Sequence, residues 1–162
     1  MKTAIYPGTF DPITYGHIDV IKKSLNIFDR VIVATTDNIN KNYYFSINER
    51  LDIINNSLFK DLKLNKKKIK VISFNNLTID LCNKYKANTI IRGLRAVSDF
   101  EYEFQLAGMN KKLNSNIETM FLMSDVENQI ISSKFVKEIA SLGGNINRFV
   151  TKYTVKMLKN KF

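Results

Sequence analysis

The sequence is poor in residues that form covalent or metal cross-links. Cys82 is the only cysteine among 162 residues, so no internal disulfide can form. With a single histidine, a zinc site built from cysteine and histidine is excluded as well. The surrounding segment TIDLCNKY favours a buried structural thiol. We therefore predict no metal site made by the protein itself.

Long apolar runs are also missing. No window comes near the roughly 18 consecutive apolar residues that a membrane-spanning helix needs. The N-terminal segment MKTAIYPGTF lacks the apolar stretch of a secretory signal. We expect a soluble, cytoplasmic protein with no membrane partner. The 44% hydrophobic content over this length predicts a single domain, residues 1–162, with a proper apolar core.

Acidic residues are scarce relative to basic ones, and the formal net charge is +10. Such an excess raises the alternative of a nucleic-acid-binding module. The excess consists of 20 lysines against 5 arginines, accompanied by 19 asparagines, which indicates a general compositional drift. The densest basic run, KLNKKKIK at 63–70, has no interleaved aromatics on which bases could stack. We expect no nucleic-acid partner, whereas a basic surface favours small anions such as nucleotides.

Short β-branched runs alternate with segments of helical periodicity. This alternation predicts an α/β fold, a Rossmann-like, doubly wound parallel sheet of five strands. Helical spacing is seen, for example, in Ile18, Ile21 and Leu25, and later helices are expected at 98–113, from Ser132 to a stop at Gly143-Gly144, and at 152–159. The predicted strands are 3–6, 30–36, 69–74, 88–91 and 117–122. In such a sheet, ligands bind beyond the carboxyl ends of the strands.

The first loop, 6–17, contains both prolines, two of the six glycines and the only histidine. Gly8 would let the backbone approach a phosphate, and Thr9 offers an amide and a hydroxyl to the same anion. Gly16 and His17 open a helix, whose dipole favours anions and disfavours a second proton on the imidazole. A neutral His17 could donate a hydrogen bond to phosphate. A tight turn followed by a helix cap explains the same residues equally well.

Two further segments carry candidate chemistry. Arg92 and Arg95 flank Gly93 in the loop expected after the fourth strand, and arginine makes bidentate contacts to phosphate. Two solvated loop arginines are the simpler alternative. Ser132-Ser133 begins an amphipathic helix, where serine serves as an N-cap or exposes amides to a phosphate. Asp99 and Glu103 lie one turn apart on the fourth helix, and for Asp99 we favour a plain polar helix face.

The run Thr14-Tyr15-Gly16-His17 resembles the T/H-x-G-H signature of the nucleotidyltransferase superfamily, whose histidine contacts the nucleotide phosphates. The stretch YPGTFDPIT before it is similar to the opening of the phosphopantetheine adenylyltransferases. Further similar segments follow at Lys41, at IRGLRAVSDFEYE (91–103) and at ISSKFVKEIA (131–140), so that the resemblance spans nearly the whole chain.

The resemblance implies reversible transfer of AMP from Mg-ATP to 4'-phosphopantetheine, which gives dephospho-coenzyme A and pyrophosphate. His17 is the implied catalytic residue at the α-phosphate. The implied acceptor contacts are Thr9, Lys41, Arg92 and, more weakly supported, Thr78. The implied ATP contacts are Thr9, Phe10, His17, Gly93, Leu94, Arg95, Glu103, Asn128, Gln129, Ile130, Ile131, Ser132, Ser133 and Lys134.

Two positions depart from the family pattern. Family members usually have an aromatic residue or histidine at Asn128 and a small hydroxyl residue at Lys134, so the phosphate contacts of this segment can differ here. A different nucleotidyltransferase, such as a cytidylyltransferase or a nicotinamide mononucleotide adenylyltransferase, is the alternative within the enzyme class. The resemblance also implies Mg²⁺ arriving with ATP and a homohexamer. The apolar side chains that exceed the needs of one face of the fourth helix are Phe100, Tyr102, Phe104 and Met109.

Overall fold

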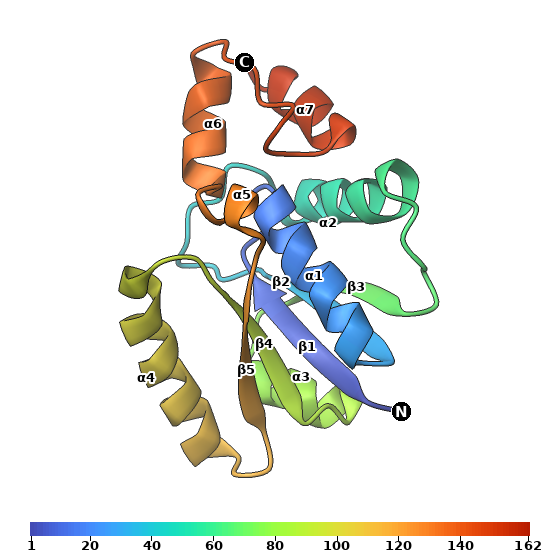
Figure 1. The fold of residues 1–162 in the computed structure, drawn as a ribbon, viewed down its shortest axis with the longest axis vertical. Coiled ribbons are helices and arrows are strands. Elements are labelled where there is room, and N and C mark those ends of the chain that lie inside the picture. Colours follow the sequence, from blue (N-terminus) through green and yellow to red (C-terminus); the bar gives the residue numbers. More distant parts are fainter.

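The computed structural model describes the backbone of all 162 residues and every side chain except that of Ser98. Five parallel strands form one sheet in the order β3-β2-β1-β4-β5 (Figure 1). This confirms the predicted parallel five-stranded α/β sheet. Two strands have their predicted bounds. The strands are β1 (Thr3–Gly8), β2 (Arg30–Thr36), β3 (Ile69–Phe74), β4 (Thr89–Leu94) and β5 (Glu118–Met123).

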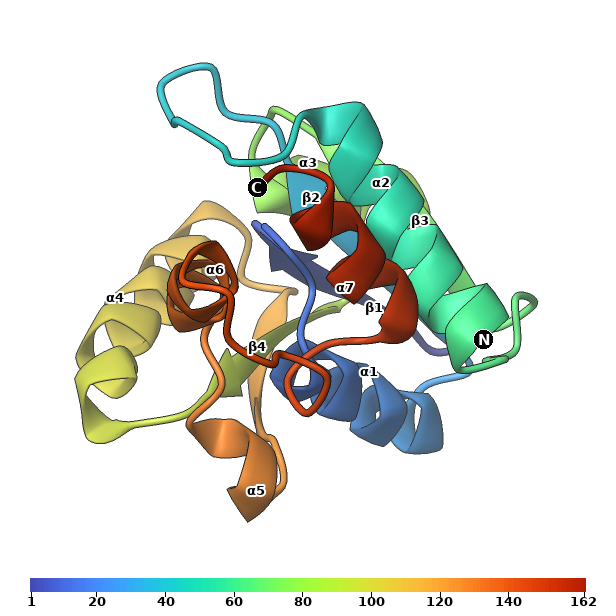
Figure 2. The ribbon, with the colours of Figure 1, turned by 90° about the horizontal axis from the view of Figure 1, so that it is seen from above.

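Helices cover both faces of the sheet, as a doubly wound fold requires. Successive side chains of a strand point to opposite faces, and the core divides accordingly: Ala4 and Tyr6 pack on one face, Ile5 on the other. The first face is covered by α1 (Tyr15–Ile27), α2 (Ile47–Asn55) and α7 (Lys152–Lys159), and the second by α3 (Thr78–Tyr85). The last helix, α7, lies beside α2 although the two are far apart in the sequence (Figures 1 and 2).

Two strands are longer than predicted at the carboxyl edge. β1 continues to Gly8 and β4 to Leu94, whereas we expected them to end at residues 6 and 91. The parallel ladder explains the extension, because Gly8 still pairs with Thr35 and Leu94 with Met123. Arg92 and Gly93 are therefore placed by a strand rather than by a loop. Their backbone is fixed by pairing with the neighbouring strand.

Some helices agree with their predicted bounds, and two short helical segments were not predicted. α4 (Val97–Leu113) matches the expected helix within one residue, while the short helix α5 (Val126–Gln129) and a π-helical turn after α2, η1 (Asn56–Asp61), were not predicted. α6 (Ser133–Ser141) begins after the N-cap Ser132, whose side chain accepts a hydrogen bond from the N–H of Phe135. It ends before Gly143, whose φ of 76° lies in the left-handed region that glycine adopts without strain.

Cys82 is a residue of α3 and is buried in the core cluster between this helix and the sheet, which confirms the predicted buried thiol. Burial raises the pKa of this thiol to about 11, so it stays protonated at neutral pH. Among the described residues, no helix is both long and apolar enough to cross a membrane.

Candidate active site

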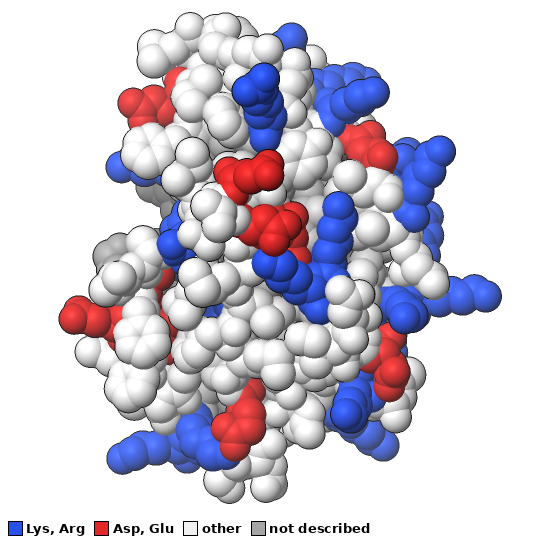
Figure 3. Space-filling view, in the orientation of Figure 1, with Lys and Arg blue, Asp and Glu red and all other residues white. Residues whose placement is uncertain are grey.

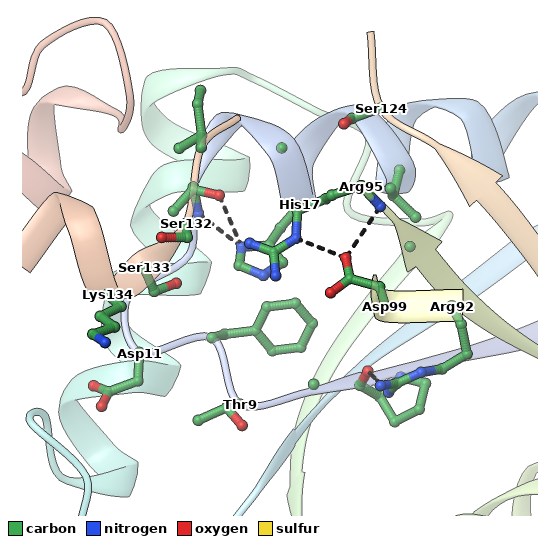
Figure 4. A pocket seen from close by; sticks show the side chains of 18 of the residues that line it. Thr9, Asp11, His17, Arg92, Arg95, Asp99, Ser124, Ser132, Ser133 and Lys134 are labelled. Carbon is green, nitrogen blue, oxygen red and sulfur yellow. Dashed lines mark hydrogen bonds and ion pairs between the residues drawn. The ribbon is translucent and has the colours of Figure 1, made fainter. Parts of the chain in front are cut away.

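The carboxyl ends of β1, β2, β4 and β5 surround a cavity of about 580 Å³ (Figure 4). It combines segments that are far apart in the sequence: the loop after β1, the loop after β2, the end of β4 with the start of α4, and the start of α6. Thirteen of the predicted site residues line it, namely Thr9, Phe10, His17, Lys41, Arg92, Gly93, Leu94, Arg95, Glu103, Ile131, Ser132, Ser133 and Lys134.

Four predicted residues do not line the cavity in this structure. Thr78 begins α3, which packs against β1 on the second face of the sheet, and Ile130 is 81% exposed. The side chain of Asn128 donates to Asp19 Oδ2 at 2.6 Å, and that of Gln129 to the carbonyl of Ser124 at 3.2 Å. The Asn128 amide thus ties the segment between β5 and α6 to α1, and the Gln129 amide forms a hydrogen bond within that segment. Direct ligand contacts of all four residues stay predictions.

His17 has a single possible neutral tautomer in this structure. It stands in the first turn of α1, and its Nδ1 accepts a hydrogen bond from the backbone N–H of Thr14 at 3.1 Å. A backbone N–H can only donate, so the proton of the neutral ring must be on Nε2. Burial, and then the charges of Arg95 and Arg92, lower the pKa of His17 to about 4. His17 is therefore neutral at physiological pH and has one N–H to offer a ligand.

Phe10 buttresses the histidine. Its ring packs edge-on against His17, with centroids 5.1 Å apart, and against Tyr6 on the other side. A Cβ on Gly8 would lie 2.8 Å from the Phe10 ring. The need for glycine at position 8 therefore comes from packing of Phe10 in this structure. Close approach of a phosphate, which we expected there, is not required to explain it.

Arg92 is held by Glu103 in a two-point ion pair. Nε donates to Oε2 at 2.7 Å and one Nη to Oε1 at 2.6 Å, while the other Nη donates to the carbonyl of Pro7 at 3.0 Å. Three of the five guanidinium N–H groups are thus used, and two are left for a ligand. The side chains are 23% and 9% exposed, so the pair is largely shielded from water. Glu103 therefore orients Arg92 and balances its charge.

Asp99 differs from its expected place on a polar helix face, because it lines the cavity. It accepts hydrogen bonds at 3.3 Å from Nε and from the backbone N–H of Arg95 (Figure 4). The two residues stand at the entry to α4, where a carboxylate is also favoured by the helix dipole. Asp99 thus directs Arg95 while leaving part of its guanidinium free.

Asp11 was missed in the sequence and joins three parts of the site. Its carboxylate accepts from the backbone N–H groups of Tyr44 and Phe45 at 2.7 and 2.9 Å and from Lys137 Nζ at 3.4 Å. It is only 6% exposed. The loop after β1, the loop that carries Lys41, and helix α6 are therefore tied together at one side chain. Lys137, also missed, lies one turn after Ser133 on the same face of α6.

A fully buried arginine, Arg50, also connects the loops after β1 and β2. Arg50 Nη1 donates to the carbonyls of Thr9 and Thr36 at 3.0 and 2.7 Å, and its Nε donates to the carbonyl of Phe45. Thr9 is thus positioned through its backbone carbonyl, and the residue lines the cavity. By contrast, Lys41 and Lys134 make no ion pair with any side chain that the structure describes.

The comparisons with known proteins agree with this arrangement. Residues 5–139 match the cytidylyltransferase-like family. A phosphopantetheine adenylyltransferase of Pelagibacter ubique (strain HTCC1062) is 69% identical over 99% of this chain and 98% of the relative. One of Vesicomyosocius okutanii subsp. Calyptogena okutanii (strain HA) is 47% identical with the same coverage. The chain belongs to the phosphopantetheine adenylyltransferases.

This membership confirms the enzyme class predicted from the motifs, a nucleotidyltransferase of coenzyme A biosynthesis, and does not favour the other nucleotidyltransferases. Among solved structures, the Plasmodium falciparum nicotinic acid mononucleotide adenylyltransferase complexed with APC superposes with a TM-score of 0.72. It is 18% identical and covers 98% of this chain and 94% of its own, so it bears on the fold alone. The Rossmann-like architecture is thereby confirmed.

The acidic residues of this adenylyltransferase cavity are not arranged as a metal cage. Asp11, Asp99 and Glu103 each form an ion pair with a cationic side chain. In the described part of the chain, no three His, Cys, Asp or Glu side chains gather in a way that could hold a metal ion.

Proposed function

We propose that the chain transfers AMP reversibly from ATP to 4'-phosphopantetheine, with release of pyrophosphate and formation of dephospho-coenzyme A. The observation that carries the proposal is the single cavity where the Nε2–H of a neutral His17 meets Arg92, Arg95, Lys41 and Lys134. A charge-rich cavity without an activated nucleophile of its own suits the joining of two anionic substrates. The activity for which both relatives are named, adenylyl transfer to phosphopantetheine, fits this chemistry.

The proposed reaction needs no general base. A phosphate monoester has its second pKa near ~6, so the acceptor is largely a dianion at neutral pH. An acceptor oxygen attacks the α-phosphorus of ATP, the bond between the α-phosphorus and the bridging oxygen breaks, and pyrophosphate leaves with the electron pair. Positioning and electrostatics then supply most of the rate.

Each residue receives one role in this scheme. His17 Nε2–H stabilises negative charge on the α-phosphate in the transition state. Lys41 and the two free N–H groups of Arg92 grip the acceptor phosphate, and Thr9 contacts both substrates where they meet. Arg95, the first turn of α6 and Lys134 hold the triphosphate. Glu103 is proposed to contact ATP as well as to orient Arg92, and Mg²⁺ is proposed to enter on the triphosphate.

Pyrophosphate release tests the function. The protein should release pyrophosphate from Mg-ATP with 4'-phosphopantetheine, and not with pantetheine, which lacks the attacking phosphate. Nicotinamide mononucleotide and phosphocholine, with ATP or CTP, serve as acceptors of the alternative nucleotidyltransferases. Turnover restricted to one of those, or salt-sensitive retention on DNA without any turnover, would contradict the proposal. On the face in Figure 3 basic side chains are interspersed with acidic ones, which supports a small-molecule role.

We further propose that residues 1–162 form a single cytoplasmic domain that assembles as a homohexamer. Four large apolar side chains of α4 support assembly, because they are exposed in the isolated chain: Phe100, Tyr102, Phe104 and Met109, at 47 to 65%. Exposed apolar surface of this kind is typical of subunit interfaces. Size-exclusion chromatography with light scattering at micromolar concentration should give a hexamer, and Phe104→Lys should shift it to smaller species. A monomer at micromolar concentration would contradict this proposal.

A further inference from the structure

Among the described side chains, two buried polar atoms have no hydrogen-bond partner, Oδ1 of Asn56 and Oγ of Ser124. Asn56 lies in η1 and does not line the cavity, and its amide nitrogen donates to Asp52 in the preceding helix α2. Ser124 differs, because it lines the cavity although the residue is only 4% exposed. An unpartnered buried hydroxyl is unfavourable in a ligand-free protein. Such a group at a cavity wall points to a missing partner.

The sheet places Ser124 next to the nucleotide-binding strand end. Leu94 of β4 pairs with Met123 of β5, so continuing the parallel register by one residue sets Ser124 beside Arg95. Figure 4 shows Ser124 at the opposite end of the cavity from Thr9 and Asp11. A ligand that extends along the ends of β4 and β5 therefore reaches Ser124.

Apart from Arg95, the cavity wall near Ser124 is formed by uncharged residues. Val20 and Gly93 also line this part, and a Cβ on Gly93 would lie 3.4 Å from Cγ2 of Val20 and 3.6 Å from the hydroxyl of Tyr6. Without a side chain at position 93, a ligand can contact the backbone of β4 at this point. The free amides of α6, Lys134 and His17 lie at the other, cationic part of the cavity, where the triphosphate belongs.

We propose that Ser124 is a specificity-determining residue for the nucleotide, and that its hydroxyl forms a hydrogen bond with the Watson–Crick or Hoogsteen edge of adenine. The inference rests on the proposed function and adds the residue that contacts the base. A serine hydroxyl both donates and accepts, so it can serve the 6-amino group or a ring nitrogen. Rotation about the single χ1 bond, among staggered positions, turns the enclosed oxygen toward the base.

Ser124→Ala tests the proposal in two opposite directions. Loss of the bond should weaken ATP binding, measured by calorimetry, about 3- to 15-fold, while phosphopantetheine affinity stays unchanged. The ligand-free variant should melt about 1–4 °C higher, because an unpartnered buried hydroxyl has been removed. A residue with only a structural role would not combine weaker ligand binding with a more stable free protein.

Ser24→Ala is the matched control. Ser24 is a fully buried serine on α1 whose hydroxyl already donates to the Val20 carbonyl at 2.6 Å. Removing that hydroxyl should lower the melting temperature and leave ATP affinity unchanged. The contrast with Ser124→Ala isolates the unpartnered hydroxyl at the cavity from the general effect of deleting a buried serine oxygen.

Nucleotide analogues identify the atom that is recognised. The Ser124→Ala effect should fall below twofold for at least one of purine riboside triphosphate, 1-deaza-ATP and 7-deaza-ATP, which lack the 6-amino group, N1 and N7. It should persist in full for 2'-deoxy-ATP and 3'-deoxy-ATP. An effect that survives all three base analogues, vanishes with a deoxyribose, or is absent for ATP would overturn the inference. If the wild type turned over ATP with 4'-phosphopantetheine in the same experiment, the proposed function would still stand.

Discussion

The backbone N–H of Thr14 donates to Nδ1 of His17 at 3.1 Å, and this one bond fixes the tautomer of the neutral imidazole. Because the donor is an amide, Nδ1 must be unprotonated and Nε2 must carry the hydrogen. Thr14 is the N-cap of α1, so the geometry follows from the same turn that begins the helix. A residue that caps a helix thus also sets the tautomer of the side chain three residues later.

His17→Ala should lower kcat about 10²-fold or more while leaving both substrate affinities nearly intact. The reason is that a donor aimed at charge developing in the transition state contributes little to ground-state binding. His17→Gln keeps a donor of similar reach and should recover part of the loss. Steady-state kinetics with calorimetric binding constants separate the two effects. Loss of ATP affinity at unchanged kcat would contradict the assigned role.

The same histidine should make stability fall in mild acid. The unfolded imidazole titrates near its ordinary value of 6.5, and the folded one near pKa 4, so only the unfolded state takes up the proton between these pH values. The wild type should therefore lose roughly 2 kcal/mol from this group between pH 7.5 and pH 5. His17→Gln should lack this component, which urea unfolding at the two pH values measures. An equal pH dependence in both proteins would show that His17 is not held neutral.

The ion pair of Arg92 and Glu103 should be strongly coupled. Removing either side chain leaves the other shielded and unpaired, so Arg92→Ala and Glu103→Ala should each destabilise by roughly 2–3 kcal/mol. The double variant should lose less than the sum, with a coupling of about 1–2 kcal/mol in urea unfolding. The exposed pair Arg95 and Asp99 is the matched control, with an expected coupling below about 0.5 kcal/mol. Additive losses for the shielded pair would contradict the orienting role of Glu103.

Much of the sheet and of the cavity could be predicted from sequence because the signals are local. β-branched runs between helical segments located β2 and β3 to the residue. The dense first loop drew attention to His17, which lies in the cavity and is neutral, while its contact with phosphate stays a prediction. The ends of β1 and β4 could not be located in the same way. Their last residues join strands only because neighbouring strands offer pairing partners there.

The missed residues act over distances that the sequence does not display. Asp11 serves backbone amides 33 and 34 residues away, so no local pattern marks it. Two other missed residues did have local signals. Lys137 shares a helix face with Ser133. Ser124 follows a strand, where ligand-binding residues are common in this type of sheet. Gly8 was singled out correctly, but packing of Phe10 explains it in this structure.

Asp11→Asn should weaken the binding of phosphopantetheine more than the binding of ATP. The amide keeps one acceptor oxygen, so one of the N–H groups of Tyr44 and Phe45 loses its partner and the loop carrying Lys41 is less firmly held. We expect a loss of about 1–3 kcal/mol in unfolding free energy. The KM for phosphopantetheine should also rise, as we expect for Lys41→Ala, which removes the proposed contact to the acceptor phosphate. Asp29→Asn, which alters an exposed carboxylate that accepts only from the N–H of Lys2, should change neither. Equal weakening of both substrates by Asp11→Asn would refute the loop-positioning role.

Lys134→Ser should lower the affinity for ATP several-fold and leave the affinity for phosphopantetheine unchanged. Lys134 lies in the first turn of α6, where a cation opposes the helix dipole by about 0.3–1 kcal/mol, so a nearby anion is needed to offset it. Its side chain lines the cavity, and we assign that anion to the β,γ-phosphates. The variant should stay folded because Ser132 still caps the helix.

Salt separates this role from that of an ordinary surface lysine. The difference in ATP affinity between wild type and Lys134→Ser should shrink as ionic strength rises from about 0.01 to 1 M, because a partly exposed charge contact is screened over this range. Lys152→Ser is the control, since Lys152 also stands in the first turn of a helix, α7, but does not line the cavity. It should bind ATP like the wild type at every salt concentration. If Lys134→Ser bound ATP as tightly as the wild type and Lys152→Ser at every salt concentration, Lys134 would only point into solvent.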